Sequence, residues 1–239
     1  MKVVIKVGTS SLAIRRIHLG LVQQIVQLQS QGVQILLVSS GAVARGRELL
    51  HSVTSSKQTF ASIGQVKLMQ VWAELFSLFD LQVGQVLLTK EDFGKATQET
   101  LNGLLREKII PIINENDTVA ASQARIGNND SLAALVARLI DADRLILLTD
   151  QEGLYTADPR LHPDAKLIPF VRKIDETLFD FAKGSSTGVG TGGMATKIEA
   201  ALVASRAGIP TTVASATRPN VLLDWVGGKE IGTLFEEVR

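Results

Sequence analysis

The fold is decided by two short apolar runs near the start of the chain, VVIKV at residues 3–7 and QILLV at residues 34–38. Between them, residues 19–31 carry apolar side chains at helical spacing, and Gly32 follows as a predicted C-cap. Neither run alternates apolar with polar residues, which is typical of strands buried on both faces. This order of strand, helix and strand predicts a parallel pair joined by a crossover helix.

The same alternation continues along the rest of the chain. Further strands are predicted at residues 83–88, 109–113, 145–148 and 211–214, and further helices at residues 42–50, 62–79, 132–140 and 191–207. Turn signals between residues 149 and 169 predict a small excursion such as a hairpin. We therefore expect an α/β protein with a single domain over residues 1–239, a three-layer αβα sandwich around a mainly parallel open sheet.

The composition excludes several classes of protein. The chain has 239 residues, of which 45% are apolar, too many for a disordered protein. It has no cysteine, which excludes disulfides, zinc–thiolate sites and cysteine nucleophiles, and its three histidines are far apart in the sequence. A net charge of +1 argues against nucleic-acid binding, and no apolar run reaches the roughly 20 residues of a membrane span. We expect no signal peptide and a cytoplasmic location.

Candidate site residues follow the strands, because ligands of open α/β sheets bind beyond the carboxyl ends of the strands. Lys6 lies inside the first strand, where it either reaches a functional edge or extends along the sheet to solvent. Ser40 follows the second strand, as a ligand-binding residue or a plain N-cap. Thr149 and Asp150 follow a later strand, where they either hydrogen-bond a nucleotide or start a turn.

Two clusters of short polar side chains, at residues 114–117 and 127–130, flank one predicted connection. Amide and carboxylate groups of this kind hold an amino group, a hydroxyl or Mg²⁺, but they also make turns and caps. Their occurrence at neighbouring strand ends favours a polar substrate site.

The glycine-rich segment TGVGTGGMATK at residues 187–197 does not fit the usual nucleotide motifs. It contains the G-x-G-x-x-G pattern of dinucleotide-binding folds, but it does not follow the first strand, where that pattern belongs. It is not a Walker motif either, because Gly193 is followed by Met194 and not by lysine. An amide-rich loop that leads into a helix bearing Lys197 suits an anion, although a surface loop has the same composition. Two lysines and amide-rich turns, without a nucleophile, favour phosphoryl transfer, which depends on positioning and charge neutralisation.

Six segments in this order carry a resemblance to a known family: IKVGTS at 5–10, VSSGA at 38–42, INEND at 113–117, GNND at 127–130, LTDQEGLYTADPR at 148–160 and GTGGMATK at 190–197. The ordered set resembles the catalytic domain of the glutamate 5-kinase family, within the amino-acid kinase superfamily, over essentially the whole chain. The resemblance implies ATP-dependent phosphorylation of the γ-carboxylate of L-glutamate to L-glutamyl 5-phosphate, the first step of proline biosynthesis. Two alternatives stay open: a superfamily kinase for acetylglutamate, aspartate, carbamate or uridylate, and an inactive amino-acid sensor.

The resemblance also implies a role for each matching residue. The catalytic residues would be Lys6, Lys197 and Asp130, and the substrate would bind to Ser40, Asp117 and Asn129. The nucleotide would meet Lys6, Thr149, Asp150, Thr191, Gly192, Gly193, Met194, Ala195, Thr196 and Lys197. Mg²⁺ would be held mainly by the ATP phosphates, so no protein metal site is expected.

The chain departs from the family pattern in three places that look shortened: after Ala13, around residues 50–56 and around residues 92–100. These departures bear on glutamate affinity, proline feedback inhibition and subunit assembly. The C-terminal PUA domain of many relatives is not found in these 239 residues. The resemblance implies a homodimer or homotetramer and proline as a feedback inhibitor. The net charge and the lack of a long apolar run lead us to expect neither nucleic acid nor a membrane as partner.

Overall fold

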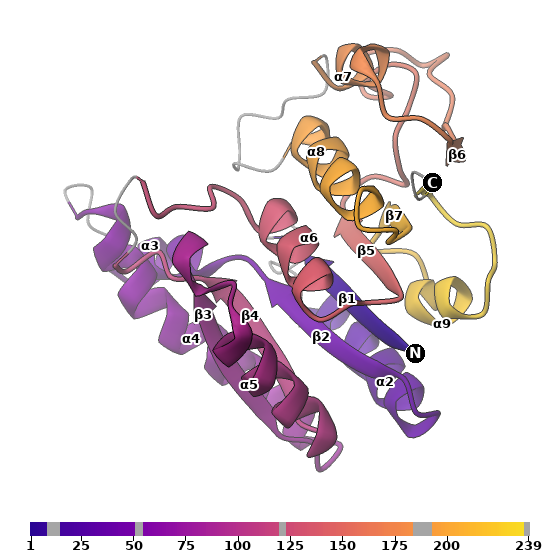
Figure 1. Cartoon of the computed structure of the whole chain (residues 1–239). Helices are drawn as coiled ribbons and strands as arrows, with labels where there is room; N and C mark the ends of the chain where they lie inside the picture. Colours follow the sequence, from indigo (N-terminus) through magenta and orange to yellow (C-terminus); the bar gives the residue numbers. More distant parts are fainter. Residues whose placement is uncertain (9–14, 51–54, 120–122, 184–192, 237–239) are drawn as a thin grey trace.

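One sheet with helices on both of its faces organises the protein (Figure 1). The computed structural model describes residues 1–8, 15–50, 55–119, 123–183 and 193–236. Within these residues the sheet has eight strands in the order β3-β4-β2-β1-β5-β7-β8-β6. The strands are β1 Lys2–Val7, β2 Gln34–Ser39, β3 Val83–Leu88, β4 Ile110–Glu115, β5 Arg144–Thr149, β6 Phe170–Val171, β7 Thr211–Ser215 and β8 Thr233–Phe235.

The sheet is mainly parallel, as the sequence predicts. β1 pairs with β2 in register Val3 to Ile35, and α2 makes the crossover between them. β1 also pairs with β5, β5 with β7, and β4 with both β2 and β3, all in parallel. Only β8, among the described strands, runs antiparallel to a neighbour, β7. The carboxyl ends of β1, β2, β4 and β5 therefore meet at one edge of the sheet.

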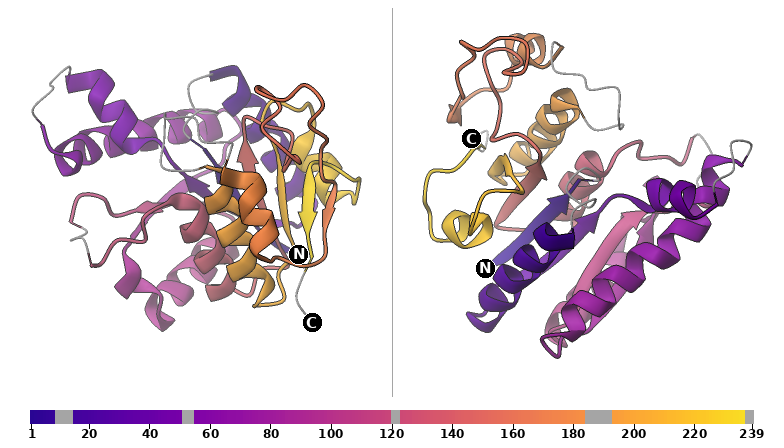
Figure 2. Two further views of the ribbon diagram at one scale, coloured as in Figure 1. Left: turned by 90° about the horizontal axis from the view of Figure 1, so that it is seen from above. Right: turned by 180° about the vertical axis from the view of Figure 1, so that it is seen from behind.

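The central strands are buried on both faces because successive side chains enter two separate cores. Val4 of β1 packs into the core that also contains residues of α6 and α8. Its neighbours Val3 and Ile5 pack into the other core, with residues of α2 and α4. Figure 2 shows the same division, with α2 and α4 on one face of the sheet and α6 and α8 on the other. The predicted three-layer αβα architecture is confirmed.

Helices make up the outer layers. They are α2 Arg15–Ser30, α3 Ala42–Leu50, α4 Lys57–Ser77, α5 Lys95–Arg106, α6 Asn129–Leu139, α7 Glu176–Lys183, α8 Met194–Ser205 and α9 Val221–Val226, with the short 3₁₀ helix η1 Lys90–Asp92. None of the described helices is both long and apolar enough to cross a membrane.

α3 and α4 pack against each other with their backbones in contact. A Cβ atom on Gly64 would overlap the carbonyl oxygen of Ala42, and one on Gly46 would overlap the carbonyl oxygen of Phe60. Only glycine allows this approach at both positions. The contact fixes α3, which begins two residues after Ser40, on top of α4.

Some elements differ from the sequence prediction. α4 begins at Lys57, five residues before the predicted start, because Ser56 accepts a hydrogen bond from Thr59 N and caps the helix there. The patterns do not predict α5, α7, α9, β6 and β8, which are short or carry few apolar residues. The excursion at residues 149–169 does contain an antiparallel bridge, between Tyr155 and Leu167, as a hairpin would.

Candidate active site

Lys6, Asp130 and Lys197 form one buried cluster. Lys6 Nζ lies 2.6 Å from Asp130 Oδ1, and Lys197 Nζ lies 3.3 Å from Asp130 Oδ2. The three residues are 5%, 1% and 4% exposed. The sequence predicts all three as catalytic residues, and the structure brings them together from β1, α6 and α8.

Each member of the cluster is positioned by a different local feature. Lys6 extends past the end of β1, since a Cβ on Gly8 would stand 3.6 Å from Lys6 Nζ. Asp130 lies in the first turn of α6, whose N-cap Asn128 accepts from Ser131 N. Lys197 lies one turn after Gly193, the N-cap of α8. Both helices therefore point their positive N-terminal ends toward the cluster.

The electrostatics of the cluster are those of two cations held by a single anion. Burial alone raises the pKa of Asp130, but attraction to Lys6 and Lys197 outweighs it, so that the pKa falls to about 2. Burial lowers the pKa of Lys197 below its usual value, and repulsion from Lys6 adds to this, while Asp130 and Asp150 oppose it. The excess of positive charge suits an anionic ligand such as a phosphate.

Thr196 belongs to this cluster as well. Its Oγ1 lies 2.7 Å from Asp130 Oδ2 and 2.8 Å from the carbonyl oxygen of Gly193. The sequence predicts Thr196 as a nucleotide-binding residue, but here its hydroxyl contacts the carboxylate between the two lysines. It thereby ties the first turn of α8 to the first turn of α6.

Polar side chains from β4, α4 and α6, together with Ser40 just after β2, form a second group beside the cluster. Asn129 Nδ2 lies 2.9 Å from Ser40 Oγ and 2.9 Å from Asn114 Oδ1. Asn114 Nδ2 in turn donates to Gln65 Oε1 across 2.9 Å. Two predicted substrate residues, Ser40 and Asn129, are thus in direct contact. They are linked to Asn114, which belongs to the predicted polar cluster at residues 114–117, and through it to Gln65, which the sequence does not single out.

The loop before α6 is held in place by a buried carboxylate. Glu115 Oε1, at the end of β4, accepts from Ile126 N across 2.6 Å and from Gly127 N across 3.2 Å. These bonds tie the loop directly to the sheet edge, three residues before Asp130. Glu115 therefore supports both polar groups of the site without belonging to either.

Asp117, the third predicted substrate residue, is paired with a lysine. Lys57 Nζ, at the start of α4, lies 2.8 Å from Asp117 Oδ1. In the described part of the chain no hydrogen bond joins Asp117 to Ser40 or Asn129. The carboxylate of Asp117 therefore binds the ammonium group of a lysine of the chain itself.

Apart from Lys6 of β1, the described nucleotide residues lie at the carboxyl end of β5 and at the start of α8. Thr149 Oγ1 donates to Asp150 Oδ1 across 3.0 Å at the carboxyl end of β5. Asp150 is close enough to Lys197 to act on its charge. Met194 is buried in the core and Ala195 packs against it, so that their backbone groups, not their side chains, are left for a ligand. Thr191 and Gly192 lie outside the described residues.

The sequence patterns did not identify Gln65 or Lys57 as site residues. For Gln65, its position on the apolar face of α4 could have indicated a buried polar contact. Gln65 interrupts the apolar face of α4 between Ala61 and Leu68, four and three residues away, and it is 8% exposed. A glutamine on a buried helix face needs a hydrogen-bonding partner. Lys57 is a charged residue at a helix start, which the sequence alone cannot assign to a site.

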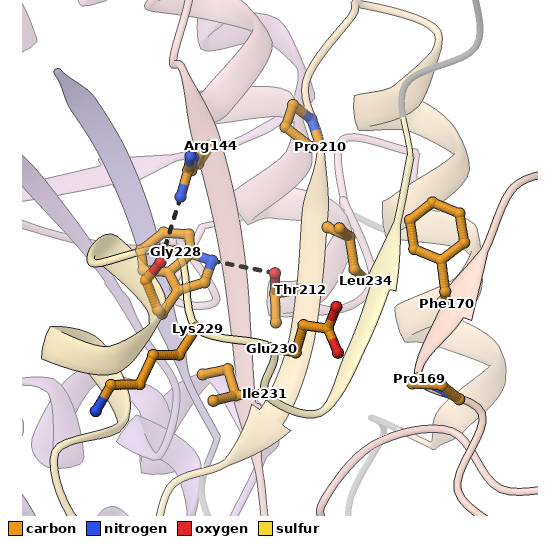
Figure 3. Close-up of a pocket in the computed structure, with 11 residues that line it drawn as sticks. Arg144, Pro169, Phe170, Pro210, Thr212, Gly228, Lys229, Glu230, Ile231 and Leu234 are labelled. Atoms are coloured by element: carbon orange, nitrogen blue, oxygen red, sulfur yellow. Dashed lines mark hydrogen bonds between the residues drawn. The ribbon is translucent and has the colours of Figure 1, made fainter.

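A cavity of about 410 Å³ lies elsewhere, at the amino-terminal end of β5 (Figure 3). It is lined by Arg144, Phe170, Thr212, Trp225 and Leu234, among others. Arg144 and Thr149 are the first and last residues of β5, so that this cavity is at the opposite end of the strand from Asp150. None of the predicted site residues lines it.

Comparisons with a family model and with individual proteins place the chain in the same family. A family model described as the amino acid kinase family matches residues 1–215. The chain is 47% identical to glutamate 5-kinase of Pasteurella multocida, over 97% of this chain and 68% of that protein. It is 47% identical to glutamate 5-kinase of Shewanella oneidensis, over 100% and 68%, and 46% identical to that of Vibrio campbellii, over 98% and 66%. The chain thus spans about two thirds of the length of these relatives.

Solved structures agree on the fold. Carbamate kinase from Giardia lamblia bound to AMP-PNP has a TM-score of 0.72 at 15% identity, covering 98% of both chains. UMP kinase from Bacillus anthracis has a TM-score of 0.70 at 14% identity, covering 100% of this chain and 96% of that one. At these identities the likeness establishes the shared α/β architecture alone.

Proposed function

We propose, because the chain belongs to the amino acid kinase family, that it transfers the γ-phosphoryl group of ATP to the γ-carboxylate of L-glutamate. The product would be L-glutamyl 5-phosphate, the first intermediate of proline biosynthesis. The observation that carries the proposal is the buried cluster of Lys6, Asp130 and Lys197. High identity to three glutamate 5-kinases supports the choice of acceptor.

In this reaction a carboxylate oxygen of glutamate attacks the γ-phosphorus of ATP, and the bond from that phosphorus to the oxygen of ADP breaks. Lys6 contacts the moving phosphoryl group from the glutamate side and Lys197 from the nucleotide side. Both ammonium groups stabilise its negative charge in a site shielded from water. Asp130 is a positioning residue, since its carboxylate holds the two ammonium groups before ATP binds.

The acceptor is held at the carboxyl ends of β2 and β4. Ser40 donates to a carboxylate of glutamate, and Asn129 and Asp117 accept from its ammonium group. The ion pair of Asp117 with Lys57 supports this role, because the carboxylate already holds a lysine ammonium. Glutamate would compete with Lys57 for that carboxylate.

The nucleotide is held at the carboxyl end of β5 and at the start of α8. Thr149 and Asp150 meet its base or ribose, while residues 191–197 bind its phosphates through backbone N–H groups and Lys197. The described residues contain no group of three or more acidic or histidine side chains that could hold a metal ion. We propose that Mg²⁺ is carried by the ATP phosphates, where it would neutralise their charge, with few protein ligands.

The proposal extends to domain organisation, assembly and regulation. Residues 1–239 act as one catalytic domain, copies of the chain form a homo-oligomer, and proline inhibits the reaction. Leu49 and Leu50 of α3 and Val66 of α4 are exposed, which supports a contact between copies on this helix pair.

A hydroxamate assay tests the proposed reaction. With ATP, glutamate and hydroxylamine, we expect γ-glutamyl hydroxamate, because the nitrogen of hydroxylamine attacks the acyl carbon and displaces phosphate. Acetylglutamate, aspartate and carbamate serve as comparison substrates. Turnover of one of these acids without turnover of glutamate would identify a different kinase of the family. Glutamate binding without turnover of any acid would indicate a sensor.

A further inference from the structure

Gln65 is a buried polar residue at the far end of the chain of amides beside the catalytic cluster. It lies in the middle of α4 and is 8% exposed. Its Oε1 accepts from Asn114 Nδ2 across 2.9 Å, whereas its Nε2 has no hydrogen-bond partner among the described residues. A buried amide that satisfies only half of its hydrogen bonds is costly to the fold. Such a residue calls for a role besides packing.

A backbone N–H fixes the orientation of every amide in this group. Glu115 N donates to Asn114 Oδ1 across 2.9 Å, and a backbone N–H can only donate. Asn114 therefore turns its NH₂ group toward Gln65. Gln65 must accept this hydrogen bond through its Oε1. On its other side Asn114 Oδ1 has to receive a donor, and Asn129 Nδ2 supplies it across 2.9 Å.

This orientation decides which groups face the acceptor site. Asn129 uses its NH₂ group for Asn114 and Ser40, so that its Oδ1 remains as an acceptor, buried and without a partner among the described residues. Ser40 Oγ accepts from Asn129 Nδ2, which leaves its hydroxyl hydrogen available for donation. The pair thus offers one acceptor and one donor, as an amino acid with an ammonium and a carboxylate requires.

We propose that Gln65 is a positioning residue for the acceptor substrate. It touches neither substrate; through Asn114 it holds the amide of Asn129 in the orientation that presents Oδ1. The effect of Gln65 on the KM for glutamate rests on the proposed kinase function. An apolar residue at position 65 would leave Asn114 Nδ2 without its acceptor, so that the Asn114 amide, still oriented by Glu115 N, would be held less firmly against Asn129.

The test replaces Gln65 by methionine, which has a similar length but no acceptor of comparable strength. Gln65→Met is expected to raise the KM for glutamate about five- to tenfold, the effect of one hydrogen bond, and to change the KM for ATP and kcat less than about twofold. Gln70→Met is the matched control, because Gln70 is an exposed glutamine of the same helix that bonds to Glu74. It should leave all three constants unchanged.

A second measurement does not depend on activity. In ¹⁵N-labelled protein without substrates, Gln65→Met should shift the side-chain NH₂ signals of Asn114 and Asn129, whereas Gln70→Met should not. Gln65→Glu keeps an oxygen opposite Asn114 and should stay closer to the wild-type signals and KM than Gln65→Met does. If Gln65→Met does not fold, the NMR signals and the glutamate KM of Gln65→Glu are measured in its place.

The outcomes separate this inference from the proposed function. Active wild-type protein with an unchanged glutamate KM in Gln65→Met overturns the positioning role. Unchanged Asn129 signals in Gln65→Met also overturn it, whatever the enzyme turns over. Shifted Asn129 signals together with a wild type that makes no hydroxamate from glutamate support the amide orientation and reject glutamate as the acceptor.

Discussion

Lys6 Nζ and Asp130 Oδ1 lie 2.6 Å apart, and both side chains are shielded from solvent. Their pairing joins the second-last residue of β1 to the first turn of α6. Because Lys197 shares the same carboxylate, removal of that carboxylate would leave two ammonium groups facing each other in the interior. Asp130 is therefore as important for the fold of the site as for its chemistry.

Asp130→Asn is expected to lower the free energy of unfolding by about 3–5 kcal/mol, the usual cost of an uncompensated buried charge. Urea unfolding at neutral pH measures it. A double variant that adds Lys197→Met should recover part of the loss, because it removes one of the two unpaired cations. Asp224→Asn, at the more exposed pair with Lys229, should have little effect. A stable Asp130→Asn protein would contradict the ion-pair account.

Lys197→Ala is expected to lower kcat about 10²- to 10³-fold, because Lys197 stabilises charge that develops as the phosphoryl group moves. The KM for glutamate should change little, since Lys197 is assigned to the nucleotide side. Steady-state hydroxamate formation gives both constants. Lys229→Ala, at an exposed lysine outside the site, is the control. If kcat is unchanged, Lys197 has no part in the mechanism.

Lys57→Met is expected to lower the KM for glutamate by up to about fivefold. The reason is competition: Lys57 Nζ occupies Asp117 Oδ1, and a partly exposed pair of this kind is worth about 0–1 kcal/mol. Kinetics at varied glutamate concentration would show the change. Lys67→Met, at a lysine of the same helix that bonds to Gln70, should leave the KM unchanged. A raised KM in Lys57→Met would mean that Lys57 binds substrate itself.

His18 gives the fold a dependence on pH. Burial lowers its pKa to about 4, and the charge of Arg45 adds to this. Between about pH 6.5 and pH 4 the unfolded chain binds a proton that the folded protein does not, so stability falls as the pH is lowered through this window. The loss is at most about 3 kcal/mol, and less where water screens the charge. The stabilisation from Asp130 is lost at lower pH, toward its pKa of about 2.

Urea unfolding at several pH values between 7 and 4 measures this dependence. His18→Phe keeps a ring against Trp72, whose ring centre lies 5.1 Å from that of His18, and cannot be protonated. Its stability should vary less between pH 6.5 and pH 4 than that of the wild type. His162→Gln, at an exposed histidine, should follow the wild type. Equal curves for His18→Phe and the wild type would refute the assignment.

Much of the fold follows from local pattern. The apolar runs at residues 3–7 and 34–38 do pair in parallel, since strands without alternation are buried on both faces. β6 and β8 have two and three residues, too few for a periodicity to be recognised. α5 carries only two buried side chains, Leu101 and Leu105, so few apolar positions mark it in the sequence.

The sequence by itself determined the parallel sheet and the edge at which Lys6, Ser40 and Asp150 lie, because apolar pattern sets burial and parallel strands end together. The partners of these residues were decided by the tertiary structure alone. Asp130 meets Lys197 across 67 positions of sequence, and Asn114 meets Gln65 across 49. Periodicity tells which side chains are buried but not which of them touch; that depends on how distant helices pack onto the sheet.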